Sequence, residues 1–179
     1  MKKNISPTIE TVDNFLEPDE FEQIRALMTS DMFPWYYNDH IIREGLQVSE
    51  TLECDVKNNW QFIHLFYSDH KINSPHFDIL RPIITKIDLK ALVRIKANCV
   101  ATTEKSVRHG SHVDFYYKRC FTSIFYVNTN NGFTQFKTGE KVGSVANRLI
   151  TFPSPTYHSG VSCTDKQVRM VINFNLERA

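Results

Sequence analysis

The stretch "RHGSHVDFYYKRCFTSIFYVN", residues 108–128, joins a histidine and an aspartate two positions apart to a run of aromatic and β-branched residues. Such a run is typical of a β-strand, because these side chains pack well on a pleated, half-buried surface. We therefore place His112 and Asp114 at the head of a strand, where residues i and i+2 share one face. An imidazole and a carboxylate directed into the same space supply two-thirds of a 2-His-1-carboxylate triad, a donor set that suits Fe(II).

A second His-x-Asp triplet, His76-Phe77-Asp78, is interpreted as a coincidence. Ser74 and Pro75 before it are typical of a helix N-cap and first turn, and an apolar stripe at helical spacing follows. On a helix, residues two positions apart point about 200° away from each other. The two side chains could not bind one ion, so this triplet predicts no metal site.

One histidine downstream of Asp114 is available as a third ligand. His158 lies 44 residues after Asp114, behind a predicted strand "RLITF" (148–152) and a proline-containing turn. An antiparallel meander can bring the end of such a strand back beside the first strand. The spacing permits this convergence and does not require it.

The segment "QVRMVINFN" (167–175) predicts a strand with one apolar and one polar face. Arg169 heads the polar, inward face, eleven residues after His158. A buried guanidinium is costly without an anion, and its preferred partner is a carboxylate that accepts two parallel hydrogen bonds. The anion could be an internal Asp or Glu in a structural salt bridge, or a bound carboxylate, and the spacing does not choose between them.

The remaining patterns predict an α+β chain. Acidic residues around Pro18 begin a helix over residues 17–28, and residues 60–67 form an alternating strand in which His64 is a hydrogen-bonded core histidine. The aromatic segment 31–47 has no periodicity and is assigned to a loop. From Leu92 onwards, short strands recur at roughly 8–12-residue spacing, which is typical of an antiparallel sandwich or barrel.

Composition narrows the class of protein. With 179 residues, 41% hydrophobic and 23% charged, the chain suits one globular domain. The net charge of +1 does not indicate nucleic-acid binding. No apolar window approaches the length of a membrane span, and the N-terminus lacks the apolar stretch of a signal peptide. The four cysteines are scattered without a C-x-x-C pair, so we expect reduced thiols and a cytoplasmic protein.

Taken together, H-x-D, a histidine 44 residues later and an arginine eleven further on resemble the Fe(II)/2-oxoglutarate-dependent oxygenase family, in particular its prolyl 4-hydroxylase-like branch. "HVDFYYKRCFTSIFYVNTNNGFTQF" resembles the strand and hairpin after that family's metal motif, and "NRLITFPSPTYHSGVSCTDKQVRMVINFN" resembles its closing segment. The likeness covers roughly residues 90–176, and "DNFLEPDEFEQIRAL" resembles the family's lead-in more weakly. It implies a double-stranded β-helix (jelly-roll) core over 91–176, supporting N-terminal helices and strands over 1–90, and a single domain over 1–179.

The resemblance also implies roles for individual residues. Fe(II) would be held by His112, Asp114 and His158. Arg169 would bind the distal carboxylate of 2-oxoglutarate, Tyr126 would hydrogen-bond the same carboxylate, and Leu149 would contact this co-substrate. The implied activity is a non-haem iron dioxygenase that consumes 2-oxoglutarate and O2, releases succinate and hydroxylates a C–H bond, with ascorbate as an accessory reductant.

Two departures from the family pattern leave the substrate open. Arg169 stands where several prolyl hydroxylases have lysine, and Cys99 stands where the family has a tyrosine. The substrate could be a peptide or protein side chain, a free amino acid, a lipid or a nucleobase. We expect the stretches 33–40 and 100–111 to border it, because long loops beside a rigid site carry specificity. His109, in a glycine-containing loop, is expected to be exposed.

Two other classes of protein would keep part of the pattern. A non-catalytic cupin-like binding module would keep the β core but need not keep three ligands together with an arginine. A metal-dependent hydrolase or isomerase could hold zinc or manganese with the same His/Asp/His site. Arg169 and Tyr126 discriminate between the classes, because a hydrolase has no standing need for a dicarboxylate clamp.

Overall fold

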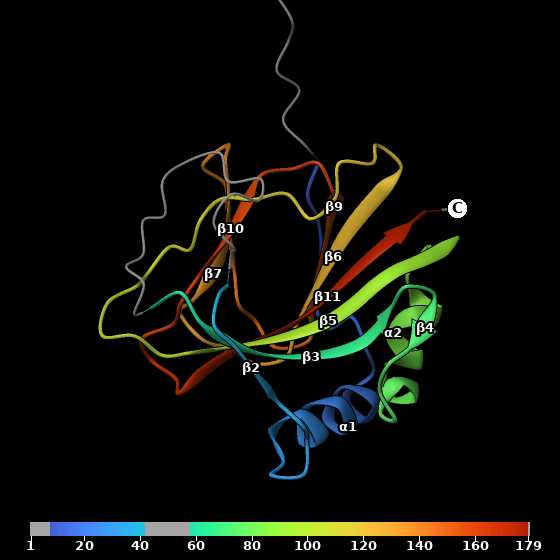
Figure 1. The fold of residues 1–179 in the computed structure, drawn as a ribbon, viewed down its shortest axis with the longest axis horizontal. Helices are drawn as coiled ribbons and strands as arrows, with labels where there is room; N and C mark the ends of the chain where they lie inside the picture. Colours follow the sequence, from blue (N-terminus) through green and yellow to red (C-terminus); the bar gives the residue numbers. More distant parts are fainter. Residues whose placement is uncertain (1–7, 42–57, 179) are drawn as a thin grey trace, which may run out of the picture.

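The computed structural model describes residues 8–41 and 58–178, and its strands form two antiparallel sheets (Figure 1). The larger sheet has eight strands and the smaller has three. Across the larger sheet the order is β1 (Glu10–Val12), β9 (Arg148–Pro153), β6 (Cys120–Tyr126), β11 (Val168–Glu177), β5 (Ala91–Ala101), β3 (Gln61–Ser68) and β2 (Tyr36–Asn38), with β4 (Lys71–Ile72) paired to β3. Across the smaller sheet the order is β10 (His158–Val161), β7 (Phe133–Phe136) and β8 (Lys141–Gly143).

The helices and the smaller sheet lie on opposite sides of the larger sheet (Figure 1). The helices are α1 (Pro18–Thr29) and α2 (Arg81–Lys86), the latter preceded by a 3-10 turn over Phe77–Leu80. Each face of the larger sheet therefore has a layer to pack against. This arrangement confirms the predicted α+β class, with a β core and supporting helices.

Strand β11 shows how alternation in the sequence builds both layers. Its residues Met170, Ile172 and Phe174 are buried in the cluster on the helix side of the larger sheet, as their apolar face predicts. Val171, on the other face, belongs to the cluster between the two sheets. Since β11 lies between β5 and β6, its polar face is enclosed at the centre of the molecule.

Helix α1 begins where the sequence predicts. Glu17 and Glu20 form a reciprocal capping box and Pro18 lies in the first turn. Ile24 and Met28 are buried, so the helix covers the larger sheet with the stripe expected from its spacing.

His64 on β3 is the core histidine that was predicted. Its side chain is buried, and its ring nitrogens contact the Pro34 carbonyl oxygen at 2.8 Å and Ser74 Oγ at 2.7 Å. Burial lowers the pKa of His64, which favours the neutral ring. Both ring nitrogens therefore have internal partners, and the residue stabilises the fold.

Two predicted boundaries change. The segment 31–47 was predicted to be a loop, but Tyr36–Asn38 form strand β2 by pairing with β3, and residues 42–47 lie outside the described residues. The triplet around His76 opens a 3-10 turn and not a regular helix, and Asp78 forms an ion pair with Arg81 at 2.9 Å. Within the described residues, His76 and Asp78 do not gather with a third possible metal ligand.

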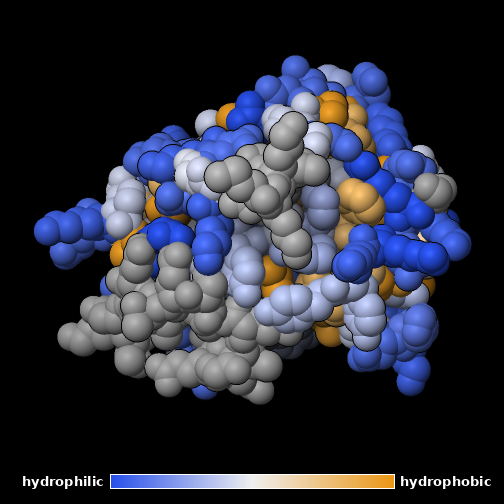
Figure 2. Space-filling view, turned by 90° about the horizontal axis from the view of Figure 1, so that it is seen from above, coloured by the Kyte–Doolittle hydropathy of each residue, from blue (hydrophilic) through white to orange (hydrophobic). Residues whose placement is uncertain are grey.

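Three of the four cysteines and both helices lie in the described residues. In residues 8–41 and 58–178, no helix has the length and apolar character needed to cross a bilayer. On the face in Figure 2, hydrophobic residues are separated by hydrophilic ones. Cys99, Cys120 and Cys163 are free thiols, as predicted, whereas Cys54 lies outside the described residues.

Asn147 ties the N-terminal segment to the sheet. Its side chain accepts a hydrogen bond from Leu16 N at 2.9 Å and donates one to Leu16 O at 2.8 Å, and its φ of 60° is left-handed. We expect Asn147→Ala to lower the free energy of unfolding by about 2 kcal/mol, because it removes two buried bonds and places alanine at positive φ. Asn147→Gly should lose less, since glycine tolerates this φ. Urea unfolding compares the variants, and an unchanged midpoint for alanine would contradict the assignment.

Candidate functional site

The backbone holds His112 and His158 side by side. His112 N donates to His158 O and His158 N donates to His112 O, both at 2.9 Å, in an isolated antiparallel bridge. The two ring centroids are 4.6 Å apart. The predicted strand head is wrong, because β6 begins only at Cys120 and His112 lies in the irregular segment before it. The bridge to His158, and not a regular strand, sets the direction of the His112 side chain.

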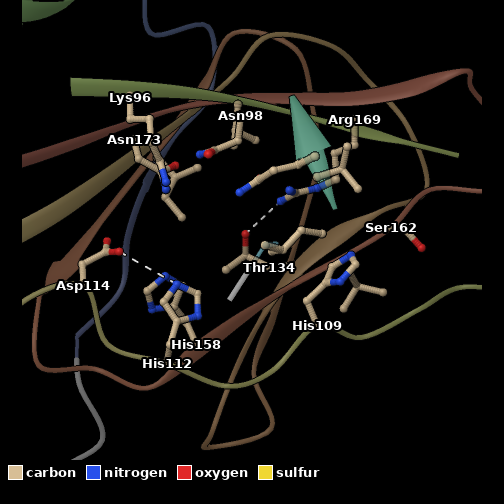
Figure 3. Close-up of a pocket in the computed structure, with 17 residues that line it drawn as sticks. Lys96, Asn98, His109, His112, Asp114, Thr134, His158, Ser162, Arg169 and Asn173 are labelled. Carbon is tan, nitrogen blue, oxygen red and sulfur yellow. Dashed lines mark hydrogen bonds and ion pairs between the residues drawn. The ribbon is translucent and has the colours of Figure 1, made fainter. Parts of the chain in front are cut away.

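Asp114 joins the two histidines in one cluster (Figure 3). One ligand atom from each of the three residues lies within 4.8 Å of the others. Of the two His-x-Asp triplets, only this one is brought together with a third donor of the kinds that bind metals in the described part of the chain.

The ring nitrogens of both histidines are oriented for metal binding. Nδ1 of His112 lies 3.3 Å from the Gly110 carbonyl oxygen, and Nδ1 of His158 lies 3.0 Å from the Thr156 carbonyl oxygen. A ring that donates from Nδ1 keeps the lone pair of Nε2 for a metal ion. Burial, followed by the neighbouring His158, lowers the pKa of His112 to about 4. His112 is therefore neutral near pH 7, which is the form that binds metals.

The Asp114 carboxylate is fixed through one oxygen. Oδ2 accepts hydrogen bonds from Thr122 Oγ1 at 2.9 Å and Asn175 Nδ2 at 3.0 Å. Oδ1 lies 3.9 Å from His112 Nε2 and 3.6 Å from Arg94 Nη2. Burial raises the pKa of Asp114, but the neighbouring histidines and Arg94 lower it by more. The pKa of this carboxyl therefore stays well below its usual range. The group is an ionised donor with one oxygen directed at the histidines.

This donor set fits a divalent transition-metal ion. Imidazoles with a free Nε2 and a desolvated carboxylate match the 2-His-1-carboxylate pattern of non-haem Fe(II) sites, and zinc accepts the same ligands. The hydrogen bonds from Thr122 and Asn175, together with the carbonyls facing each Nδ1, are the outer contacts that usually orient such ligands.

Arg169 lies at the other end of the same cavity and has no ion-pair partner within the described ranges (Figure 3). It is only 5% exposed, and it donates from Nε to Ser144 Oγ at 2.9 Å and from Nη2 to Thr134 Oγ1 at 3.1 Å. Gly132 lies against its stem, since a Cβ there would be 2.8 Å from Arg169 Cδ. The sequence left two partners open for Arg169, an internal Asp or Glu and a bound carboxylate. Among residues 8–41 and 58–178, no Asp or Glu forms a salt bridge with it.

Tyr126 lies beside Arg169 but is not among the residues that line the cavity. The Arg169 guanidinium lies 5.6 Å from the centre of the Tyr126 ring, and Tyr126 Oη donates to Thr134 Oγ1 at 2.8 Å. The two side chains thus share Thr134 as an acceptor.

Leu149 is not brought to the cavity, which corrects the prediction that it contacts a co-substrate. It pairs with Phe125 across β9 and β6, and both belong to the cluster on the helix side of the sheet. The next residue, Ile150, pairs with Ile124 and packs in the cluster between the sheets. Adjacent strand residues face opposite sides, so Leu149 points away from the layer between the sheets.

Strand β5 contributes residues that the sequence analysis did not assign to the site. Lys96 and Asn98 line the cavity, and Lys96 is the ladder partner of Asn173 on β11. Burial lowers the pKa of Lys96 to about 8. The signal was the alternation of Arg94, Lys96 and Asn98 with apolar residues, a pattern that in a central strand indicates a polar enclosed face.

The prediction that His109 is exposed is wrong. The side chain is 2% exposed and lines the cavity at the Arg169 end (Figure 3). Of the two stretches expected to border a substrate, 100–111 contributes Val100 and His109 to the lining, whereas no residue of 33–40 lines the cavity.

Comparisons with known proteins bear on the fold. No family model matches the sequence, and no curated protein is similar to it in sequence. An oxidoreductase of the 2OG-Fe(II) oxygenase family from Burkholderia pseudomallei has a similar structure, with a TM-score of 0.65 at 12% identity over 98% of this chain and 88% of that chain. A Trichoplax adhaerens prolyl hydroxylase, in complex with a peptide of the hypoxia inducible factor oxygen degradation domain, gives 0.59 at 11% over 94% and 83%. The α-ketoglutarate-dependent epimerase SnoN of nogalamycin biosynthesis gives 0.62 at 12% over 97% and 79%.

These likenesses identify the fold as the double-stranded β-helix of the 2-oxoglutarate-Fe(II) oxygenases. Within that class, the neighbours include prolyl hydroxylases, so the resemblance predicted from the motifs is confirmed at the level of the fold. Identities of 11–12% do not carry over a substrate or a reaction.

The support of Asp114 gives a prediction for metal affinity. We expect Thr122→Val to weaken metal binding by about 10- to 100-fold, because Asp114 loses a hydrogen bond that orients it. Thr151→Val is the matched control, since Thr151 is also a buried threonine of the larger sheet, but its hydroxyl bonds to Ser123 and not to Asp114. Competition with a chromophoric chelator measures both affinities. Equal affinities in the two variants would show that Thr122 does not support the ligand.

Proposed function

We propose that this protein is an Fe(II)- and 2-oxoglutarate-dependent dioxygenase. The observation that carries the proposal is the buried Arg169, which has no carboxylate partner among residues 8–41 and 58–178. It faces the cavity that holds the His112, Asp114 and His158 cluster at its other end. A metal centre and an unneutralised guanidinium in one cavity suit a ligand that chelates at one end and carries a carboxylate at the other. 2-Oxoglutarate has this shape.

The chain's own residues would divide the work. His112, Asp114 and His158 would hold Fe(II), which supplies O2 activation coupled to decarboxylation of 2-oxoglutarate to succinate. Arg169 would bind the distal carboxylate through its guanidinium fork, with Ser144 and Thr134 fixing its orientation. Tyr126 lies against the arginine and shares Thr134 with it, so it would support the same subsite. Ile124, Val161 and Val171 also line the cavity and would exclude water from it.

The substrate is proposed only as a class. A prolyl hydroxylase neighbour binds a peptide, which favours oxidation of a C–H bond in a peptide or protein side chain. The similarly folded epimerase shows that this fold also supports other outcomes. We further propose that the protein is cytoplasmic, because its described cysteines are free thiols. We also propose one oxygenase domain over 1–179 and ascorbate as the accessory reductant.

Succinate formation tests the proposal without knowledge of the substrate. Purified protein with Fe(II), ascorbate, 2-oxoglutarate and O2 should form succinate slowly in the uncoupled reaction, and candidate peptides should accelerate it. Arg169→Leu and Asp114→Ala should reduce succinate to the level without protein. If the protein shows a hydrolytic or isomerising activity that Zn(II) supports as well as Fe(II), the hydrolase or isomerase alternative is favoured. If no succinate forms beyond the level without protein and no such activity is found, the binding module is favoured.

A further inference from the structure

His109 is a buried histidine that lines the cavity. It is 2% exposed, and neither ring nitrogen has a hydrogen bond among the described residues. His64 is equally buried, yet both of its ring nitrogens have partners within the fold. Buried polar groups are nearly always hydrogen-bonded, so an imidazole without partners that faces a cavity points to a ligand.

An irregular pairing directs His109 into the same cavity as His112. Arg108 forms a bridge with Val161, and His112 forms a bridge with His158. The four residue steps from Arg108 to His112 are thus paired with only three from His158 to Val161. This extra residue is a bulge, and the His109 amide within it donates to the Gly160 carbonyl oxygen at 3.0 Å. On a regular strand, positions i and i+3 would face opposite sides, whereas here both histidines line the cavity.

The electrostatic setting of His109 suits an anion. Burial, followed by the charge of Arg169, lowers the pKa of His109 to about 4, so the ring is neutral near pH 7 and keeps one N–H donor. Arg169 and Thr134 line the same end of the cavity (Figure 3). A guanidinium fork, a hydroxyl and an imidazole N–H thus gather where the described residues provide no carboxylate to receive them.

We propose that His109 is a co-substrate-binding residue, whose ring N–H donates to the distal carboxylate of the 2-oxo acid bound by Arg169. This inference rests on the proposed function and adds a second side chain to its specificity. The same short segment would then hold a metal ligand at His112 and a carboxylate donor at His109. Selection for dicarboxylic over monocarboxylic 2-oxo acids would depend on both His109 and Arg169.

Binding of two ligands to the Mn(II)-loaded protein under anaerobic conditions tests the inference. Calorimetry should compare 2-oxoglutarate with 2-oxovalerate, in which a methyl group replaces the distal carboxylate. We expect His109→Leu to weaken 2-oxoglutarate binding roughly 10- to 100-fold, because a hydrogen bond to a charged group is lost, and to change 2-oxovalerate binding less than about twofold. His109→Gln, which keeps a donor, should recover most of the affinity.

The outcomes separate this inference from the proposed function. If the unaltered protein binds 2-oxoglutarate no better than 2-oxovalerate, the proposed function fails at the Arg169 end. If it prefers 2-oxoglutarate and His109→Leu keeps the full preference, or weakens both ligands equally, the role of His109 is overturned while the proposed function stands. Ring 15N spectra of the unaltered, Zn(II)-loaded protein remain decisive if a variant does not fold. The His109 signals should shift with 2-oxoglutarate and not with 2-oxovalerate, and unchanged signals would overturn the inference.

Discussion

Alanine at His112 should weaken Fe(II) binding by more than about 100-fold, whereas alanine at His76 should leave it unchanged. Loss of an outer contact alone costs 10- to 100-fold in metal affinity, and this substitution removes a donor itself. The two histidines head the two His-x-Asp triplets of the chain, but within the described residues only His112 lies in a cluster of three possible ligands. Anaerobic equilibrium dialysis with iron analysis measures both affinities.

The aspartates of the two triplets extend the comparison. Asp114→Ala should match His112→Ala, and Asp78→Ala should match the unaltered protein, because Asp78 is an exposed partner of Arg81. Similar losses in all four variants would indicate a general effect on folding. Loss at His76 and Asp78 alone would mean that the second triplet is the metal site.

Leucine at Arg169 should abolish measurable binding of 2-oxoglutarate without destabilising the ligand-free protein. The guanidinium is buried among hydroxyls and has no ion pair in the described parts of the chain, so its removal relieves an uncompensated charge. We expect the free energy of unfolding to change by less than about 1 kcal/mol or to rise, and the Kd for 2-oxoglutarate to increase by more than about 100-fold. Calorimetric binding and thermal unfolding measure the two effects.

Arg148 provides the matched control. It forms an ion pair with Asp13 on the surface, so Arg148→Leu should leave 2-oxoglutarate binding unchanged. Arg169→Lys should fall between the extremes, because lysine keeps the charge but loses the planar fork. A large loss of stability in Arg169→Leu, with 2-oxoglutarate binding intact, would return Arg169 to a structural role.

Periodicity in the sequence predicted much of the fold, because the larger sheet has a different layer on each face. Along β11, alternate residues face opposite sides of the sheet. Met170, Ile172 and Phe174 lie on the helix side, and Arg169, Val171 and Asn173 line the cavity. The capping residues of α1 likewise predicted where that helix begins. These features depend on local pattern and can be recognised without knowledge of tertiary contacts.

Register and irregular pairing could not be predicted. Leu149 faces the helix side because it is opposite Phe125, and only the pairing of β9 with β6 decides which of two adjacent apolar residues packs between the two sheets. The bulge that turns His109 inward depends on a bridge to β10, a strand of four residues, His158–Val161, with little β propensity. The three candidate metal donors could therefore be recognised from the sequence, whereas the place of His109 in the cavity could not.

The metal and the co-substrate can be tested together in one titration. Fe(II) is added anaerobically to the protein with and without 2-oxoglutarate, while the weak visible charge-transfer absorption of a chelated 2-oxo acid is recorded. The proposed function predicts a band that saturates at one equivalent of Fe(II), requires 2-oxoglutarate and is lost in Asp114→Ala. The proposed function would be contradicted if no band appears with Fe(II) and 2-oxoglutarate present, and the protein either binds zinc tightly or binds no metal at all.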